Sequence, residues 1–249
     1  MEASTARWLE VQGLRIHCLT AGETGSPLLL LHGGFIDHAS LSYRHCIGPL
    51  SRTHRVFAPD LPGFGKSDKP RIQYTTDYYI SFLGHLMEAL GLARTHLAGV
   101  SQGGAVALGF SLQSPERVDR LVLAGTYGLG NKVPYGLLAY LVVRLPIFDR
   151  RLLLTLGQSS VVIRLVARLV TYDRRALTDE LVDEIRQTLR EPGVGEAWRS
   201  WQKREIHWRH LHTDYVGQLA RLRVPTLLLD GARSRLGPVR WAERAHALI

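Results

Sequence analysis

The sequence predicts an α/β protein built on a mostly parallel sheet with helices on both faces, and two observations predict it. Short apolar runs bounded by Gly, Pro or Asp alternate with segments whose apolar residues recur at helical spacing. One connection, of about 85 residues, has a helical pattern throughout and is far too long for an ordinary loop. Alternating strands and helices give a parallel sheet, so we expect this connection to be a helical subdomain inserted between two strands.

Six apolar runs are predicted strands, and two segments between them are predicted helices. The strands are expected at residues 15–19, 27–31, 55–58, 96–100, 120–124 and 226–229, and the helices at 78–90 and 102–113. Gly91 is expected to end the first helix, and Pro115 follows the end of the second. The predicted division is a first core part, the helical insertion and a second core part, at residues 1–125, 126–213 and 214–249.

The composition is that of a folded globular protein and gives no sign of a polyanion-binding surface. Of the 249 residues, 45% are hydrophobic and 21% are charged, and the formal net charge is +9. The arginines stand singly or in pairs, as at Arg150 and Arg151, so we expect no nucleic-acid partner. The apolar stretches are much shorter than the ~20 residues that span a bilayer, and charged residues interrupt the first segment. The sequence therefore predicts a cytoplasmic protein without a membrane span.

A glycine-flanked serine, Ser101, stands where a predicted strand ends and a predicted helix begins. In the pattern Gly99-Val100-Ser101-Gln102-Gly103, a sharp turn forces the serine into strained backbone angles and exposes its hydroxyl group. Glycines two residues to either side keep the neighbouring backbone from colliding. The pattern alone is short enough to arise by chance, but its placement directly after a strand indicates a nucleophile.

A second glycine turn, Leu31-His32-Gly33-Gly34-Phe35, follows the predicted strand 27–31. Such a turn can direct backbone N–H groups at a developing oxyanion, with Gly34 or Phe35 as one donor. The second donor would be the N–H group of Gln102, directly after the nucleophile. The alternative is an ordinary glycine turn, and the coincidence with Ser101 favours the oxyanion role. His32 itself is expected to support the turn.

A phosphate loop is a competing interpretation of Gly65-Lys66-Ser67. That motif requires a glycine five residues before Gly65, where this chain has Asp60. No helical pattern begins at Lys66 either, so we expect no nucleotide site. Asp60 and the nearby Asp68 are expected to shape the loop.

A metal site is a competing interpretation of the clustered histidines His207, His210 and His212. Only His207 and His210 would share a helical face, and no cysteine or carboxylate accompanies them in the pattern. We therefore expect no metal site, and histidines that are solvated or line a lid.

Together these segments resemble the α/β-hydrolase superfamily over essentially the whole chain. Residues 32–34 look like its oxyanion turn, residues 60–68 like its loop after a strand, and Ser101 like its nucleophile. The insertion occupies the position of the family's cap domain, and residues 224–236 are similar to the late strand and the loop that carries the catalytic acid. The resemblance therefore implies an α/β-hydrolase fold with an inserted helical cap.

The resemblance also implies an activity. A serine nucleophile points away from the dehalogenase and epoxide-hydrolase branches and towards carboxylesterases, enol-lactonases and C–C bond hydrolases. These enzymes act on small molecules, and their chemistry needs no cofactor, so we expect none. Three tryptophans of the insertion suggest an apolar or aromatic acyl pocket, although they could equally bury the insertion on the core: Trp198, Trp201 and Trp208.

The chain departs from the family pattern in its acid and its base. Ser234 stands where the family has its aspartate, and Asp230, four residues earlier, is a low-ranked substitute. His246 is the only histidine after Ser234, and its helical, apolar surroundings make it a poor base. By the family pattern, we expect the C-terminal strand, the catalytic histidine and the final helix to be missing.

Two functions follow as alternatives. The first is a serine hydrolase for an ester, a lactone or a C–C bond beside a carbonyl, shortened at its C-terminus and impaired. The second is a non-catalytic binding protein that retains the pocket. In either case, an uncovered edge along the predicted strand 226–229 would favour self-association.

Overall fold

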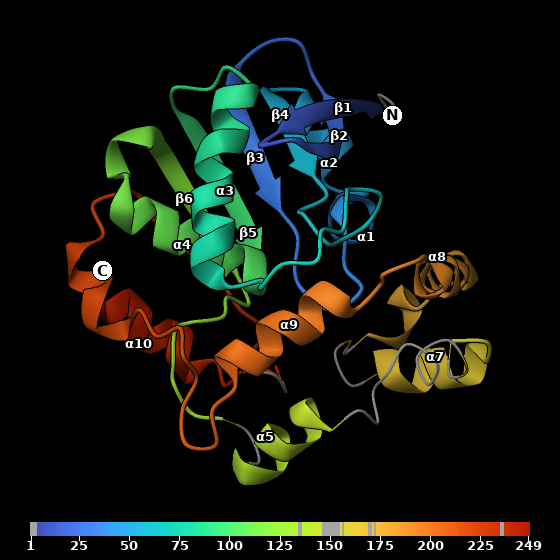
Figure 1. Cartoon of the computed structure of the whole chain (residues 1–249). Coiled ribbons are helices and arrows are strands. Elements are labelled where there is room, and N and C mark those ends of the chain that lie inside the picture. Colours follow the sequence, from blue (N-terminus) through green and yellow to red (C-terminus); the bar gives the residue numbers. More distant parts are fainter. Residues whose placement is uncertain are drawn as a thin grey trace.

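The computed structural model describes residues 4–133, 136–145, 155, 157–168, 171, 173–234 and 237–249. Its centre is a seven-stranded sheet in the order β1-β2-β4-β3-β5-β6-β7 (Figure 1). The strands are β1 Thr5–Val11, β2 Leu14–Ala21, β3 Ser26–Leu31, β4 His54–Pro59, β5 Thr95–Val100, β6 Val118–Ala124 and β7 Thr226–Leu229. The two pairs that involve β2 are antiparallel, and the other four pairs are parallel. The predicted α/β fold with a mostly parallel sheet is confirmed.

All six predicted strands are present, and the sequence analysis missed β1. This edge strand pairs only with β2, and most of its side chains are exposed, among them Trp8. An edge strand that buries so little lacks the continuous apolar run by which buried strands are recognised.

Helices cover both faces of the sheet. On one face, α3 (Thr76–Ala89) and α4 (Gln102–Gln113) pack with α10 (Arg240–Leu248) in the larger apolar core. On the other, α1 (Ala39–Tyr43) and α2 (Ile47–Ser51) close a smaller core. The short 3₁₀ turns are η1 Pro115–Arg117, η3 Arg174–Ala176 and η4 Val216–Arg221.

Between β6 and β7, the described residues form helices that are joined by loops, with one isolated β-bridge between Ile206 and Leu211. Its α-helices are α5 Gly136–Arg144, α7 Ser160–Ala167, α8 Asp179–Arg190 and α9 Glu196–Glu205. Figure 1 shows α9, in orange, crossing below the end of the sheet to which β3 points, with α5, α7 and α8 farther out. Parallel strands present their carboxyl ends at one edge, where α/β proteins place their sites. The helix α9 therefore lies across the edge of the sheet at which the carboxyl ends of the parallel strands meet.

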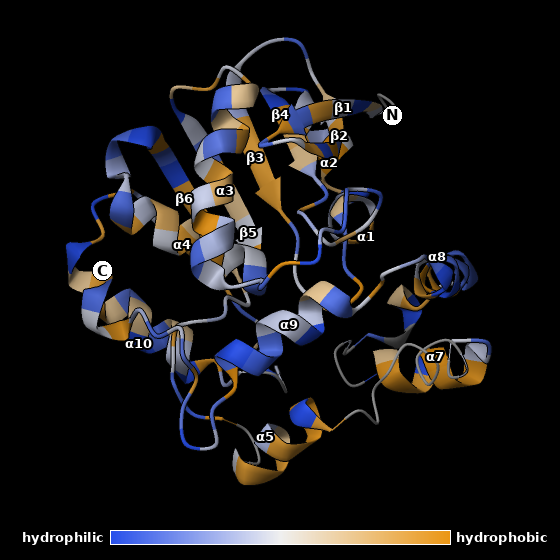
Figure 2. Cartoon of the chain, viewed as in Figure 1, coloured by the Kyte–Doolittle hydropathy of each residue, from blue (hydrophilic) through white to orange (hydrophobic). Residues whose placement is uncertain are grey.

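Hydropathy differs among these four helices. Figure 2 shows apolar colouring on α5 and α7 and hydrophilic colouring on much of α8 and α9. On α9, Ala197, Trp201 and Glu205 recur at helical spacing and are buried, so this is the face that packs on the core. Within the described ranges, no helix is both long enough and apolar enough to traverse a lipid bilayer.

Candidate active site

Ser101 connects β5 to α4 in a strained backbone conformation. Its φ of 52° and ψ of −114° make it one of three non-glycine residues with positive φ in the described chain. A β-carbon makes this region costly, so the surrounding structure must hold the residue there. The strand-to-helix turn predicted for Ser101 is present.

Two glycines make the sharp turn sterically possible. A Cβ atom on Gly99 would lie 2.4 Å from the carbonyl oxygen of Gly103, and one on Gly103 would lie 2.3 Å from the carbonyl oxygen of His32. Both distances are far below van der Waals contact. The glycines of the motif thus let α4 start against β5 and against the neighbouring turn.

The turn after β3 lies directly beside Ser101. A Cβ atom on Gly33 would be 3.5 Å from Cβ of Ser101. The N–H group of Gly33 donates to Oδ2 of Asp37 at 2.7 Å, while no hydrogen bond in the described chain uses the N–H groups of Gly34, Phe35 or Gln102. Phe35 is a second non-glycine residue with positive φ, at 67°. The three N–H groups expected to bind an oxyanion therefore have no acceptor among the described residues, and each of the two turns contains a strained residue.

His32 supports this turn with both ring nitrogens. Its Nε2 accepts a hydrogen bond from the N–H group of Leu61 at 2.9 Å, so Nδ1 carries the proton and donates to the carbonyl oxygen of Gly33 at 2.7 Å. The side chain is completely buried. His32 thus links the two loops through both ring nitrogens, so neither nitrogen is left to act as a base for Ser101.

Trp198 of α9 packs directly against Gly34 in the turn after β3. A Cβ atom on Gly34 would lie 2.0 Å from Cζ3 of Trp198, so only glycine fits under this ring. Trp198 stacks on Trp201 at 4.7 Å between ring centroids. Trp208, in contrast, is 42% exposed, and the guanidinium group of Arg209 lies over its ring. The structure therefore does not place Trp208 in an acyl pocket.

A buried carboxylate, Glu205, ties the end of α9 to the core. Its two oxygens accept hydrogen bonds from the hydroxyl groups of Thr76 and Tyr127, at 2.8 and 3.1 Å, and from the N–H group of Thr213 at 2.9 Å. Burial, and then the nearby Glu205 carboxylate, raise the pKa of Tyr127, which keeps this hydroxyl protonated and donating. Sequence analysis missed Glu205, although its spacing of four residues from Trp201 indicates that it shares the buried face.

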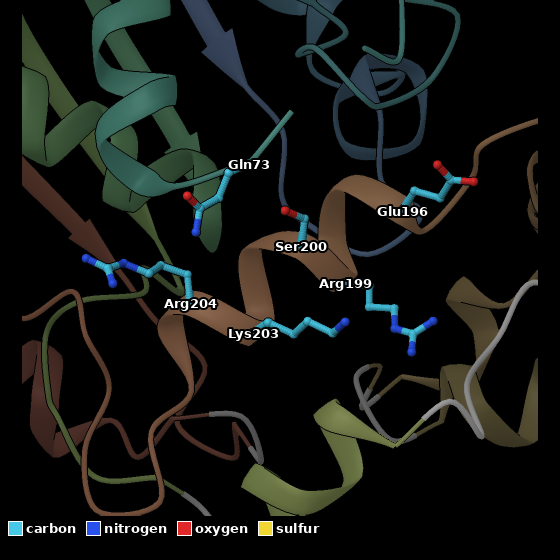
Figure 3. A pocket seen from close by; sticks show the side chains of 6 residues that line it. All are labelled: Gln73, Glu196, Arg199, Ser200, Lys203 and Arg204. Atoms are coloured by element: carbon cyan, nitrogen blue, oxygen red, sulfur yellow. The ribbon is translucent and has the colours of Figure 1, made fainter. Parts of the chain in front are cut away.

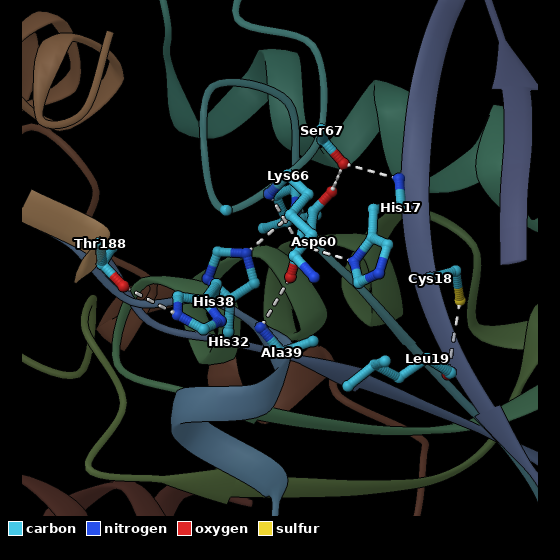
Figure 4. A network of polar contacts seen from close by, with 12 residues as sticks. His17, Cys18, Leu19, His32, His38, Ala39, Asp60, Lys66, Ser67 and Thr188 are labelled. Atoms are coloured by element: carbon cyan, nitrogen blue, oxygen red, sulfur yellow. Dashed lines mark hydrogen bonds and ion pairs between the residues drawn. The ribbon is translucent and has the colours of Figure 1, made fainter. Parts of the chain in front are cut away.

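Asp60 organises the loop after β4 (Figure 4). It accepts hydrogen bonds from Nδ1 of His17 at 2.9 Å and from the N–H groups of Ala39 and Lys66, at 2.9 and 3.0 Å. Burial acts to raise the pKa of Asp60, but the hydrogen bond from His17, the electrostatic effect of His32 and the two backbone hydrogen bonds outweigh it and lower the pKa. Asp68 accepts from the N–H group of Arg15 at 2.7 Å. Both aspartates hold loops, as expected.

The candidate acids and base lie elsewhere or are exposed. Asp230 follows β7, is exposed, and accepts a hydrogen bond from the N–H group of Gly231 at 2.7 Å. Ser234 lies four residues further in an exposed turn, and His246 is exposed on α10. All eleven histidines fall within the described chain, and none of their rings hydrogen-bonds to Ser101. The structure thus brings the turn after β3 next to Ser101, and among the described residues none of the candidate acids or bases forms a hydrogen bond with this serine.

A cavity of about 540 Å³ lies away from Ser101, which does not line it. Figure 3 shows its lining, which comes from the outer face of α9 and one loop residue: Gln73, Glu196, Arg199, Ser200, Lys203 and Arg204. In the described residues no three potential ligands cluster as a metal centre requires, and the rings of His207 and His210 stack at 4.8 Å.

The chain matches known proteins over nearly its whole length. A family model described as alpha/beta hydrolase fold covers residues 26–245, so the chain belongs to the α/β-hydrolase family. A 2-hydroxy-6-oxo-2,4-heptadienoate hydrolase of Pseudomonas putida is 30% identical over 254 aligned positions, which span 100% of this chain and 86% of that protein. A 2-hydroxymuconate semialdehyde hydrolase of a Pseudomonas species is 31% identical over 188 positions, 75% of this chain and 62% of the relative.

Solved structures agree with this assignment. A meta-cleavage product hydrolase from Pseudomonas fluorescens IP01 superposes with a TM-score of 0.81 at 28% identity, covering 98% of this chain and 85% of that one. A naproxen esterase from Bacillus subtilis superposes with a TM-score of 0.72 over 100% of this chain and 81% of its own. At 21% identity, the esterase supports the fold alone.

Proposed function

We propose that this chain is a serine hydrolase that cleaves an ester, a lactone or a C–C bond beside a carbonyl in a small apolar or aromatic molecule. The observation that supports this proposal most is the strained Ser101 beside the oxyanion turn, with the N–H groups of Gly34, Phe35 and Gln102 unused in the described chain. The homologous C–C hydrolases suggest the range of substrates.

In this proposal, Oγ of Ser101 bonds to the carbonyl carbon while the oxygen becomes negative beside the N–H groups of Gln102 and of Gly34 or Phe35. The bond to the leaving alkoxide or carbanion then breaks, and the leaving group takes up a proton. Water hydrolyses the acyl-serine and restores Ser101. The helical insertion, residues 126–213, would act as a cap, with Trp198 beside the acyl group.

The rate depends on whether a base removes the proton of Ser101. Loss of the general base costs about six orders of magnitude in kcat for a serine protease, and the oxyanion hole with binding retains about 10³ to 10⁴ over water. Asp230 is a low-ranked candidate for the acid of this proposal, because it lies directly at the end of β7, four residues before the position at which the family has its aspartate. A slow, impaired hydrolase is therefore the expected behaviour of the 249-residue chain.

Ser234 favours a second candidate, a binding protein that retains the pocket without turnover. A serine at this position cannot orient an imidazole as a carboxylate does. This alternative predicts that small aromatic esters bind near Trp198 and are recovered unchanged.

The two candidates are separated by labelling and turnover. A fluorophosphonate probe, with mass spectrometry of the labelled peptide, reports whether Ser101 is nucleophilic, and p-nitrophenyl esters, lactones and 2-hydroxy-6-oxo-dienoates report hydrolysis. We expect the probe to label Ser101, and the variant Ser101→Ala to abolish this labelling. The control variant Ser81→Ala, which changes an exposed serine of α3, should keep it. Ligand binding with neither labelling nor turnover would establish the binding protein instead.

Two further properties belong to this proposal. The chain is proposed to act in the cytoplasm on small molecules, and to self-associate through the free edge of β7. In the described sheet β7 pairs only with β6, and its Leu227 and Leu229 are 53% and 49% exposed. Such an apolar edge offers unpaired backbone groups to a second chain.

A further inference from the structure

Gln102 carries a second feature besides its backbone N–H group. Its side chain is fully buried, yet neither Nε2 nor Oε1 has a hydrogen-bond partner among the described residues. Buried amides are almost always paired, because desolvating their donors and acceptors without compensation is costly. An orphaned amide of this kind needs an explanation that the fold itself does not supply.

The position of this amide points to a ligand. A Cβ atom on Gly34 would lie 2.8 Å from Oε1 of Gln102 and 2.0 Å from the ring of Trp198. The amide therefore lies next to the oxyanion turn, on the side that Trp198 covers. Gln102 also follows Ser101 directly in the chain, so its backbone N–H group lies next to the serine while its side-chain amide lies beside Gly34.

We infer that the Gln102 side chain forms a polar subsite, which binds a substrate group that both donates and accepts a hydrogen bond, close to the scissile carbonyl. This inference rests on the proposed hydrolase function and specifies its substrates. An amide offers two donors at Nε2 and one acceptor at Oε1. An ionised carboxylate has no proton to donate to Oε1, whereas a neutral hydroxyl group can donate to Oε1 and accept from Nε2. The acyl part of the substrate is therefore expected to carry a hydroxyl group.

A matched pair of esters tests the subsite. The measurement is the ratio of kcat/KM for p-nitrophenyl 3-hydroxybutyrate to that for p-nitrophenyl butyrate. A site that hydrogen-bonds a substrate hydroxyl discriminates strongly against the analogue without it, because its own polar atoms are then left unpaired. We expect the ratio to fall about tenfold or more in Gln102→Met, which keeps the backbone N–H group and removes the amide. The control Gln113→Met, on an exposed residue of the same helix, should keep the ratio of the unaltered protein.

Binding separates this inference from the proposed catalysis. In the Ser101→Ala protein, calorimetry compares ethyl 3-hydroxybutyrate with ethyl butyrate, and we expect the hydroxylated ester to bind about tenfold more tightly. Addition of Gln102→Met, or of Gln102→Leu if the first variant does not fold, should abolish that difference. Equal affinities for the two esters in the Ser101→Ala protein overturn the subsite. If the Ser101→Ala protein binds the two esters with different affinities but the unaltered protein shows no turnover, the hydrolase function is wrong and the subsite is supported.

Discussion

The ring of Trp198 lies so close over Gly34 that a β-carbon on this glycine would be 2.0 Å from Cζ3 of the tryptophan. The two residues are 164 positions apart: Trp198 belongs to helix α9 and Gly34 to the turn after β3. Their contact couples the placement of α9 to the geometry of the turn beside Ser101. A change on either side is therefore expected to affect both stability and reactivity.

The first prediction concerns Gly34→Ala. The added methyl group must displace Trp198 or the turn, and overpacking of this kind costs about 1–3 kcal/mol. We expect a lower melting temperature, by about 2–4 °C for each kcal/mol in a chain of this size, and a large loss of fluorophosphonate labelling at Ser101. Adding Trp198→Ala to the Gly34→Ala protein should restore part of the melting temperature and part of the labelling. The matched control is Gly217→Ala, where a Cβ atom meets nothing within 4 Å. Equal labelling in Gly34→Ala and the control would show that the contact does not shape the site.

The second prediction concerns Glu205. Replacing it with alanine leaves the donors of Thr76, Tyr127 and Thr213 without their acceptor. Each buried unsatisfied group costs about 1–3 kcal/mol, so with three such groups we expect the free energy of unfolding in urea to fall by at least about 3 kcal/mol. Glu196→Ala, at the exposed start of the same helix, should change it by less than about 0.5 kcal/mol. Similar losses in the two variants would mean that Glu205 does not anchor α9.

The third prediction is the pH dependence that Asp60 causes. The pKa of Asp60 is lowered in the folded state, so its carboxylate stabilises the protein above the unfolded-state pKa of about 3.9. This contribution is lost as the pH falls through the lower, folded-state pKa. Asp60→Asn should therefore be less stable than the unaltered protein at pH 7, by about 2 kcal/mol, and the difference should shrink below about pH 4. Denaturant unfolding of both proteins at a series of pH values measures this difference in stability. Glu23→Gln, on an exposed carboxyl group, should show no such convergence, and a pH-independent deficit in Asp60→Asn would contradict the assignment.

Local patterns were sufficient to predict the strands and the turn at Ser101. The predicted strand 226–229 and the predicted helix 102–113 have the same bounds as β7 and α4. Buried parallel strands must be apolar throughout, and a sharp turn needs glycines at fixed offsets, so both features are written in short stretches of chain. The same local logic missed β1, because an exposed edge strand has no such requirement.

The contacts around the site could not be predicted in this way. The meeting of Trp198 with Gly34, and that of Glu205 with Thr76, depend on how the segment after β6 folds back over the sheet. The orphaned amide of Gln102 becomes visible only when its surroundings are known, since a glutamine at the start of a helix is usually solvated. Chemistry that arises between distant segments is invisible to patterns within one segment.

The last prediction concerns the free edge of β7. The carbonyl oxygens of Pro225 and Leu229 accept hydrogen bonds from the N–H groups of Leu121 in β6 and of Gly125 just after it. Alternate residues of a parallel strand face opposite neighbours. The N–H and C=O groups of Thr226 and Leu228 therefore point away from β6.

A second copy that pairs along this edge would also cover the exposed side chain of Leu227. We expect the average mass by light scattering to rise with protein concentration, and Leu227→Lys to hold it at the mass of one chain, because a charged side chain blocks edge pairing. Ile72→Lys, which charges an exposed apolar residue in a loop, should leave the association unchanged. A constant single-chain mass for the unaltered protein at every concentration would rule out association through β7.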